Sequence, residues 1–300
     1  MIDWSPMHNV WIKDDDGCLQ RADEPYYRVE KVRKDTWRIL SDGDFQYLVA
    51  GEKEAISIDT GYGCGDIRAF EQTLTDVPVC CAVNTHDHFD HTANNCYFDK
   101  VYMAEETVPL ATVPFPSFRS VSFPKDYPIE TVDTGDVIDL GNRTLEVFKC
   151  PDHAVGSILL LDRREHILFC GDEIFEHGKS LRGNVEIYTQ HLREIAKHRS
   201  EFDLLCAGSY VGDAIIFDRL LEVCEKALQE EGRPVIPHDH QRSYEPERNE
   251  QGEIVYHRKW PHPEDMYHPE EQAVDQTKLR VIGDEYPLTY SIDHLYAYQK

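Results

Sequence analysis

The sequence predicts a mixed α/β (α+β) fold that is richer in strand than in helix, and two observations support this class. Short apolar segments separated by turn signals recur between residues 26 and 207, which is the pattern of β-strands. Residues 213–231 instead repeat apolar side chains every three or four positions and stop at Gly232, as an amphipathic helix does. A second helix expected at residues 66–75 divides the chain into two halves, each of strands followed by a helix.

The first half is expected to contain a hairpin, a helix and a buried strand, in that order. A short polar connection around Gly51 predicts the hairpin. Ile67, Phe70 and Leu74 share one helical face, which places the helix at residues 66–75. Strands are expected at 27–32, 36–40, 45–49, 55–58, 77–83 and 101–104, with a short helical turn at 92–95.

The second half begins with a stretch that excludes regular structure. Five prolines between residues 109 and 128 predict a long loop, which would either form a substrate wall or simply cover the core. Beyond it, strands are expected at 129–132, 137–140, 145–150, 157–162, 166–170 and 204–207, with a helix at 190–202.

The composition along the chain predicts three regions. Residues 1–25 are polar and are expected to form a loosely attached N-terminal arm, and residues 26–232 form the domain. Residues 233–300 hold seven of the 16 prolines and seven of the 16 tyrosines, together with six histidines. We expect this C-terminal extension to lie over the domain or over a partner subunit, in which case it would support a homodimer.

Charge and cysteine content restrict the partners and the compartment. The formal net charge of −25 argues against a nucleic-acid partner, because phosphate binding requires Lys and Arg, and it also argues against an acidic membrane surface. No signal peptide and no apolar run of membrane-spanning length is recognised. The nine cysteines form no C-x-x-C pair, and without an export signal they are expected to be reduced thiols in a cytoplasmic protein. The expected partner is a small-molecule substrate.

A cluster of histidines and aspartates follows the strand expected at 77–83. Residues 85–91 read Thr-His-Asp-His-Phe-Asp-His, an H-x-H-x-D-H motif, and His86 and His88 point to the same side of an extended segment. Imidazole and carboxylate are ligands of zinc. The alternative is a polar surface loop, but His153 and Asp172 also follow predicted strands, and three convergent strand ends favour a metal site.

Four motifs together resemble the metallo-β-lactamase-fold superfamily over residues 26–232. They are Ile58-Asp59-Thr60-Gly61, the motif at 85–91, the segment Pro-Asp-His-Ala-Val-Gly-Ser at 151–157, and Gly171-Asp172-Glu173-Ile174-Phe175, in matching order and spacing. The resemblance implies a four-layer αββα sandwich with metal ions at one edge between two sheets.

The resemblance also implies a role for each ligand-type residue. His86, His88 and His153 would bind a first metal, Asp90 and His91 a second, and Asp172 would bridge the two. Asp59 would hold the ligating imidazoles from behind. The expected cofactor is one or two zinc ions per chain, with iron or manganese as alternatives for the same ligands.

The sequence departs from the family at the last motif. A strand followed by Gly-His completes the second metal site in the family, whereas the strand expected at 204–207 is followed by Gly208-Ser209-Tyr210. A serine hydroxyl is a poor zinc ligand. The second site could therefore be weak, empty or completed by water, or His238 or His240 of the extension could supply the ligand.

The favoured function is a metal-dependent hydrolase acting on a small-molecule ester, thioester, lactone or amide. Asp90 would orient the attacking hydroxide and take its proton, and Tyr210 is a candidate oxyanion donor whose alternative is a core tyrosine. Two other functions stay open: an oxidoreductase similar to the mononuclear-iron sulfur dioxygenases, which iron content and oxygen uptake would reveal, and a non-catalytic degenerate member of the fold.

Overall fold

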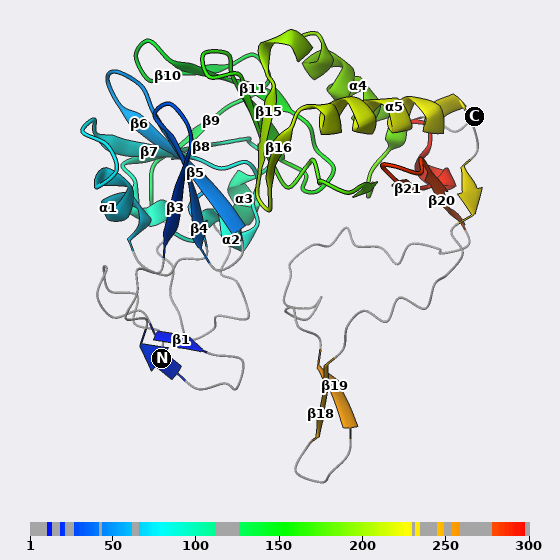
Figure 1. Ribbon diagram of the computed structural model, residues 1–300, viewed down its shortest axis with the longest axis horizontal. Coiled ribbons are helices and arrows are strands. Elements are labelled where there is room, and N and C mark those ends of the chain that lie inside the picture. The colour runs from blue at the N-terminus through cyan, green and yellow to red at the C-terminus, as the bar shows by residue number, and fades with distance from the viewer. Residues whose placement is uncertain are drawn as a thin grey trace.

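The computed structural model shows a layered body of strands and helices (Figure 1). Within the described residues no helix has the length and apolar character needed to cross a membrane. The predicted arm contains a strand pair, β1 (Trp11–Lys13) and β2 (Leu19–Arg21). The residues described are 11–13, 19–21, 27–41, 44–61, 66–111, 126–229, 232–234, 245–248, 254–257 and 278–297.

The first sheet contains seven strands that lie side by side in sequence order. Its first four strands are antiparallel, and the last four, from β6 onward, are parallel to one another. The strands are β3 (Arg28–Arg33), β4 (Thr36–Ser41), β5 (Asp44–Ala50), β6 (Ala55–Ile58), β7 (Val79–Val83), β8 (Lys100–Met103) and β9 (Ile129–Thr131).

The second sheet contains six strands, and its two central strands β12 and β13 are buried at every position. Strands covered on both faces need apolar side chains at consecutive positions, which explains why these two segments are continuous apolar runs. The strands are β10 (Val137–Asp139), β11 (Thr144–Lys149), β12 (Ile158–Asp162), β13 (Ile167–Gly171), β15 (Leu204–Ala207) and β16 (Val211–Asp213).

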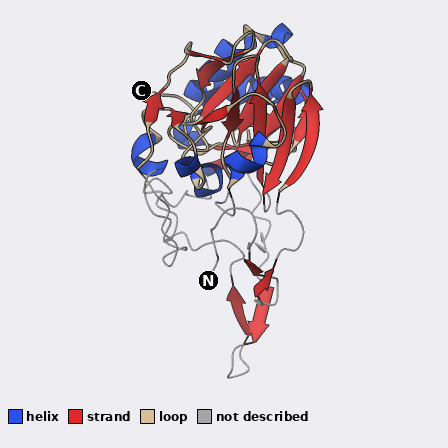
Figure 2. Ribbon diagram, turned by 90° about the vertical axis from the view of Figure 1, so that its left-hand side faces the viewer, coloured by secondary structure: helices blue, strands red, loops and turns tan. Residues whose placement is uncertain are grey.

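Three apolar clusters join four layers. One contains Ile67 of helix α1 (Ile67–Gln72) with residues of the first sheet, and a second mixes residues of both sheets. The third joins the second sheet to α4 (Val185–Ala196) and α5 (Ile215–Gln229). In Figure 1, α1 lies on one side of the strands and α4 and α5 on the other, and in Figure 2 the strands fill the middle of the body. This order confirms the predicted αββα sandwich.

Part of the predicted extension packs against the domain. Tyr286, Leu288 and Tyr290 are buried in the cluster that contains α5. They lie on or beside strands of a third sheet, ordered β14-β21-β20-β17, which the sequence reading did not predict. Its strands are β14 (Lys179–Ser180), β17 (Arg233–Pro234), β20 (Leu279–Ile282) and β21 (Leu288–Ser291), and a separate pair is β18 (Glu245–Arg248) with β19 (Ile254–His257). The boundaries at residues 25 and 232 stay predictions.

Two helix predictions are wrong in their limits. The helix expected at 190–202 is α4, which begins at Val185 because the Asn184 side chain caps it by accepting a hydrogen bond from Ile187 N at 3.1 Å. It ends at Ala196, before the 3-10 turn Arg199–Glu201. The helical turn expected at 92–95 lies earlier, as α2 (Phe89–Thr92), and a 3-10 turn follows at Asn95–Tyr97.

The predicted long loop opens with a short helix, α3 (Val108–Ala111). Most of the loop, residues 112–125, lies outside the described residues. Its two alternatives, a substrate wall or a cover over the core, therefore stay predictions.

A buried arginine ties the two sheets together. Arg143 precedes β11 and donates from Nε to Asp162 Oδ2 at 2.8 Å within the second sheet. Its NH1 group donates to Asp35 O at 2.8 Å and to Ala50 O at 3.1 Å, both in the first half of the chain. The Arg143 and Asp162 side chains are 1% and 0% exposed, so removal of either charge leaves the other buried without compensation.

Replacement of Arg143 by Met is expected to lower the free energy of unfolding by about 3–5 kcal/mol, because Asp162 and two backbone carbonyls lose their donor. Urea unfolding followed by circular dichroism measures this loss. Arg164→Met is the matched control at a more exposed arginine and should cost less than about 1 kcal/mol. Equal losses for the two variants would contradict the role given to Arg143.

Candidate metal centre

The predicted ligand residues meet because several strands finish at one edge of the sandwich. β6 and β7 are parallel neighbours, as are β13 and β15, so each pair ends on the same side. Hydrogen bonds from Ile158 N to Thr85 O at 2.8 Å and from Phe45 N to Gly208 O at 2.7 Å join the edges of the two sheets. The residues brought together there are Asp59, His86, His88, Asp90, His91, His153 and Asp172.

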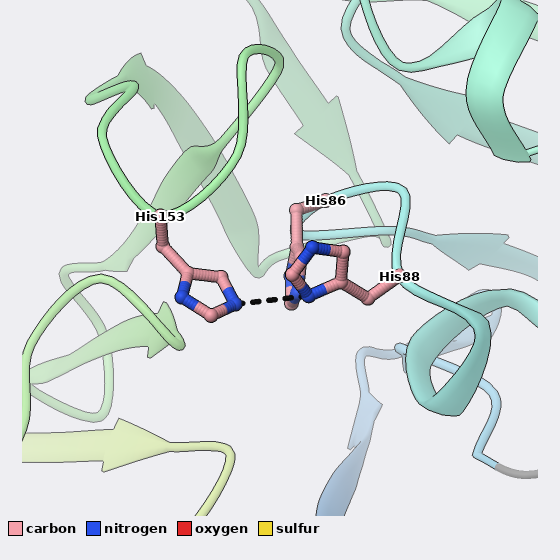
Figure 3. A group of neighbouring side chains, drawn as sticks. All are labelled: His86, His88 and His153. Carbon is pink, nitrogen blue, oxygen red and sulfur yellow. Dashed lines mark hydrogen bonds between the residues drawn. The ribbon is translucent and has the colours of Figure 1, made fainter. Parts of the chain in front are cut away.

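Three imidazoles point into a common space (Figure 3). The ligand nitrogens of His86, His88 and His153 all lie within 4.8 Å of one another, and His88 Nδ1 is 2.9 Å from His153 Nε2. Two nitrogen ligands of a tetrahedral zinc ion lie about 3.3 Å apart, given bonds of about 2.0–2.1 Å. The three histidines therefore fit a zinc-sized ion with little movement.

Asp172 lies between this triad and a second group of ligands. Its Oδ2 is 3.6 Å from His153 Nε2 and 3.8 Å from His91 Nε2, so one carboxylate faces both groups. Asp90 Oδ2 lies 3.6 Å from the same His91 nitrogen. This is the arrangement that the expected bridging role of Asp172 requires, although the role itself stays a prediction.

The carboxylate of Asp59 orients two of the histidines. Its Oδ1 accepts from Thr85 N at 2.7 Å, and its Oδ2 accepts from Thr85 Oγ1 at 2.8 Å and contacts His91 Nδ1 at 2.8 Å. Because the Thr85 hydroxyl donates to Asp59, its oxygen accepts from His86 Nδ1 at 3.0 Å. Both Nδ1 atoms thus carry hydrogen, so Nε2 is the nitrogen of His86 and of His91 that a metal would bind.

Burial and neighbouring charges set the protonation of these groups. Burial lowers the pKa of His153 to about 3, so its imidazole is neutral and able to bind a metal near pH 7. Burial also opposes the charged form of His91, but Asp59, Asp90 and Asp172 outweigh it and hold the pKa of His91 well above its usual value. Burial raises the pKa of Asp90, with a further contribution from Asp172, whereas nearby histidines keep the pKa of Asp172 low despite its burial.

A buried ion-pair network holds the loop that carries His153. Lys179 Nζ lies 3.0 Å from Asp152 Oδ2 and 2.9 Å from Glu173 Oε2, and all three side chains are 1% exposed. Glu173 Oε1 accepts from His153 N at 2.6 Å and from Asp152 N at 3.1 Å. Since Lys179 lies on β14, which pairs with β21, this network links the His153 loop to the C-terminal strands.

Two glycines allow the strand ends to approach one another closely. A Cβ on Gly171, whose φ is +49°, would lie 2.4 Å from Thr85 Oγ1 and would displace the hydroxyl that orients His86. A Cβ on Gly208 would lie 2.2 Å from Asp172 Oδ1. The backbone of Gly208 therefore contacts the candidate metal centre directly.

The remaining predicted site residues do not belong to the ligand groups or lie outside the described residues. Ser209 is exposed, and the Tyr210 ring is buried in the cluster that contains α4 and α5. No hydrogen-bond partner is found for the Tyr210 hydroxyl among the described residues. This placement agrees with a core tyrosine, and the oxyanion role stays a prediction. His238 and His240 lie outside the described residues.

The sequence reading missed one acidic residue of the centre. Asp44 directly precedes the strand expected at 45–49, and no site role is predicted for it, yet its carboxylate groups with Asp90 and His91, with all three ligand atoms within 4.8 Å of one another. A signal for it exists in the chain: Asp44 begins β5, and the antiparallel partner β6 ends just before Asp59. The start of one strand and the end of the other lie at the same edge.

An αββα sandwich with a His/Asp cluster at its edge defines a class of metal-binding proteins. Residues 44–205, more than half of the chain, match the Metallo-beta-lactamase superfamily. The chain therefore belongs to this superfamily, whose members are mostly metal-dependent hydrolases.

Several curated relatives share part of the chain. The bovine (Bos taurus) acyl-coenzyme A thioesterase MBLAC2 is 32% identical over 161 residues, which cover 43% of this chain and 58% of that protein. Atrochrysone carboxyl ACP thioesterase of Aspergillus chevalieri is 28% identical, covering 56% of this chain and 54% of its own length. Hydroxyacylglutathione hydrolase of Rhodospirillum rubrum is 27% identical, covering 52% and 62%. The chain spans less than two thirds of each.

Solved structures share the fold. A metallo-beta-lactamase from Pontibacter korlensis superposes with a TM-score of 0.52 at 18% identity, over 66% of this chain and 99% of that one. The metallo-beta-lactamase FIM-1 from Pseudomonas aeruginosa in its mono-zinc form gives 0.53 at 16% identity, over 67% and 96%. At these identities the likeness describes the fold alone.

Asp59→Asn is expected to weaken zinc binding about 10- to 100-fold, because an amide cannot replace both acceptor oxygens that orient Thr85 and His91. Competition with a chromophoric chelator measures the affinity. Asp76→Asn, at an exposed aspartate, is the matched control and should bind zinc as the wild type does. Unchanged affinity in Asp59→Asn would show that Asp59 does not orient the ligands.

A buried acid supports the backbone of Asp59 from α1. Ser57 Oγ lies 2.8 Å from Asp59 O and 2.7 Å from Glu71 Oε1. A hydroxyl has one hydrogen, so both contacts are satisfied when Glu71 is protonated and donates to Ser57. Burial indeed raises the pKa of Glu71 well above its usual value.

Near neutral pH Glu71 keeps its proton in the folded protein but loses it in the unfolded chain. Its contribution to the free energy of unfolding is therefore fully present below its pKa in the unfolded chain, about 4.3, and declines as the pH rises above that value. The slope is at most about 1.4 kcal/mol per pH unit, up to the folded pKa. Glu71→Gln removes this decline, so its unfolding free energy relative to wild type should rise between pH 5 and 8. Urea titrations across that range measure it, with exposed Glu105→Gln as the control; parallel curves for both variants would contradict the prediction.

Proposed function

We propose that this protein is a metal-dependent thioesterase that acts on a small acyl thioester. The observation that carries the proposal is the convergence of His86, His88 and His153, with Asp172 facing both ligand groups. Three imidazoles around one space are the ligand set of hydrolytic zinc sites, in which the fourth position is open to water. A net charge of −25 further supports a small-molecule substrate over nucleic acid.

A metal held by these imidazoles would lower the pKa of a coordinated water to about 7 and would stabilise charge on the substrate oxygen. Asp90 is placed to accept the proton of the attacking water, because its Oδ2 lies 3.6 Å from His91 Nε2 at the centre and burial raises its pKa. Attack of the water oxygen on the carbonyl carbon would form a C–O bond, after which the C–S bond breaks. The proton taken up by Asp90 can then pass to the departing thiolate.

The choice of a thioester, from among the candidate ester, thioester, lactone and amide substrates, rests on the relatives. Two of them are named as thioesterases, and the third is a hydrolase of hydroxyacylglutathione, which is itself a thioester. Each of these three proteins matches between 43% and 56% of this chain. They support a thioester substrate, and experiment must identify the thiol to which the acyl group is attached.

Thiol release from acyl-coenzyme A and from acyl-glutathione by the zinc-loaded protein tests the proposal. We expect hydrolysis of at least one of them, and we expect His88→Ala to lower the rate by at least about 100-fold through loss of a ligand. A β-lactam, a lactone and an oxygen ester with the same acyl group serve as comparisons.

Two outcomes would contradict the proposal. Faster turnover of the lactone or the oxygen ester than of both thioesters would remove the thioester assignment. Iron in the purified protein together with oxygen uptake on a thiol substrate would instead support the oxidoreductase alternative.

A further inference from the structure

The second group of ligands lacks the residue that completes it elsewhere in the superfamily. Ser209 occupies the expected position, and its side chain is exposed to solvent. The preceding residue, Gly208, contacts the centre through its backbone, because an added Cβ would lie 3.2 Å from His91 Cε1. The space beside His91 is therefore next to the last motif, but that motif provides no ligand for it.

The first sheet brings another residue to this place. β5 runs antiparallel to β6, so the start of β5 lies at the edge where β6 ends. The backbone N–H of Phe45 donates to Gly208 O at 2.7 Å, which holds the start of β5 against the segment that begins at Gly208. Asp44, one residue before Phe45, is thus next to Gly208 although the two are far apart in the chain.

The geometry of this group is that of a ligand set. The ligand atoms of Asp44, Asp90 and His91 all lie within 4.8 Å of one another. Two ligands on opposite sides of an ion bound at about 2.1 Å would be about 4.2 Å apart, so the three side chains can reach a common ion with shifts below about 1 Å. Asp44 and Asp90 are each partly buried, which leaves water access to the same space.

An unpartnered nitrogen supplies an independent observation. His91 is 0% exposed, and its Nε2 has no hydrogen-bond partner among the described residues, whereas its Nδ1 is bonded to Asp59. The Nε2 faces carboxylate oxygens of Asp90 and Asp172 at 3.6 and 3.8 Å. Those distances are too long for hydrogen bonds, but they leave room for an ion between the atoms.

We propose that Asp44 replaces the missing ligand and completes a second metal position with Asp90, His91 and Asp172. This inference rests on the metal-dependent function proposed above, because the second position adjoins the histidine triad through Asp172. The resulting set has one nitrogen and carboxylate oxygens from three residues, so it is harder than the triad. It should accept Mn²⁺ as well as Zn²⁺, whereas the three imidazoles favour Zn²⁺.

Metal counting on four proteins tests the proposal. Metal-free wild type, Asp44→Asn, Ser209→Ala and the double variant Asp44→Asn/Ser209→His are titrated with Zn²⁺ by calorimetry, and metal per chain is then measured by elemental analysis after gel filtration. Thermal unfolding of each metal-free protein verifies that the variants fold.

The expected result is two zinc ions for wild type and for Ser209→Ala. In Asp44→Asn one zinc stays tightly bound and the affinity of the second falls by about tenfold or more, because a neutral amide replaces a charged ligand. The double variant regains the second zinc through an imidazole at the position that the superfamily uses. A large excess of Mn²⁺ over zinc-loaded wild type should replace the second ion alone, the excess being needed because Mn²⁺ binds a shared ligand set more weakly than Zn²⁺.

Each other result overturns a specific part of the interpretation. Two tight zinc ions in Asp44→Asn would show that Asp44 is not a ligand. Loss of the second zinc in Ser209→Ala would show that Ser209 itself holds the ion, so that Asp44 does not replace a missing ligand. One zinc in wild type would remove the second position while leaving the triad and the proposed hydrolysis intact. No zinc in wild type would remove the proposed function as well.

Discussion

The arrangement of the candidate centre depends on the hydrogen bonds of the Asp59 carboxylate. Asp59 has a φ of +62°, a backbone conformation that turns its side chain from the end of β6 toward the end of β7. Its two oxygens accept from Thr85 and contact His91, and Thr85 in turn orients His86. One buried carboxylate therefore determines which nitrogens of two imidazoles remain available, before any ion is bound.

The remaining ligands depend on contacts between distant parts of the chain. His153 sits on a loop held by Glu173, which follows β13, and by Lys179 of β14, and β14 is in turn paired with β21 near the C-terminus. The C-terminal strands thus stabilise a ligand loop without touching the metal position. Their contribution is one of placement, since an imidazole displaced by about 1 Å no longer fits a rigid ligand set.

The sequence predicts most strands and ligand positions because strand patterns and ligand spacing are local, whereas the four-layer arrangement follows from the resemblance of the four motifs to a known family. The strand ends at His86, His153 and Asp172 could be recognised in this way. The strands β14 and β21 could not, since a two-residue strand has no periodicity and its partner is more than a hundred residues away. Asp44 differs, because the predicted hairpin already places the start of β5 at the edge where β6 ends. Only its position beside the last motif depends on a long-range contact, the hydrogen bond from Phe45 N to Gly208 O.

The exchange of an imidazole for a carboxylate changes the electrostatics of the second position. In the proposed set, Asp44 adds a third negative charge to those of Asp90 and Asp172 around His91, whereas a histidine at position 209 would add none. Partly buried like charges repel one another, and a divalent cation relieves that repulsion. The affinity of such a site arises from charge more than from ligand softness, so a position can lose the family's histidine and still hold a metal ion, provided that the ion is hard enough to prefer oxygen.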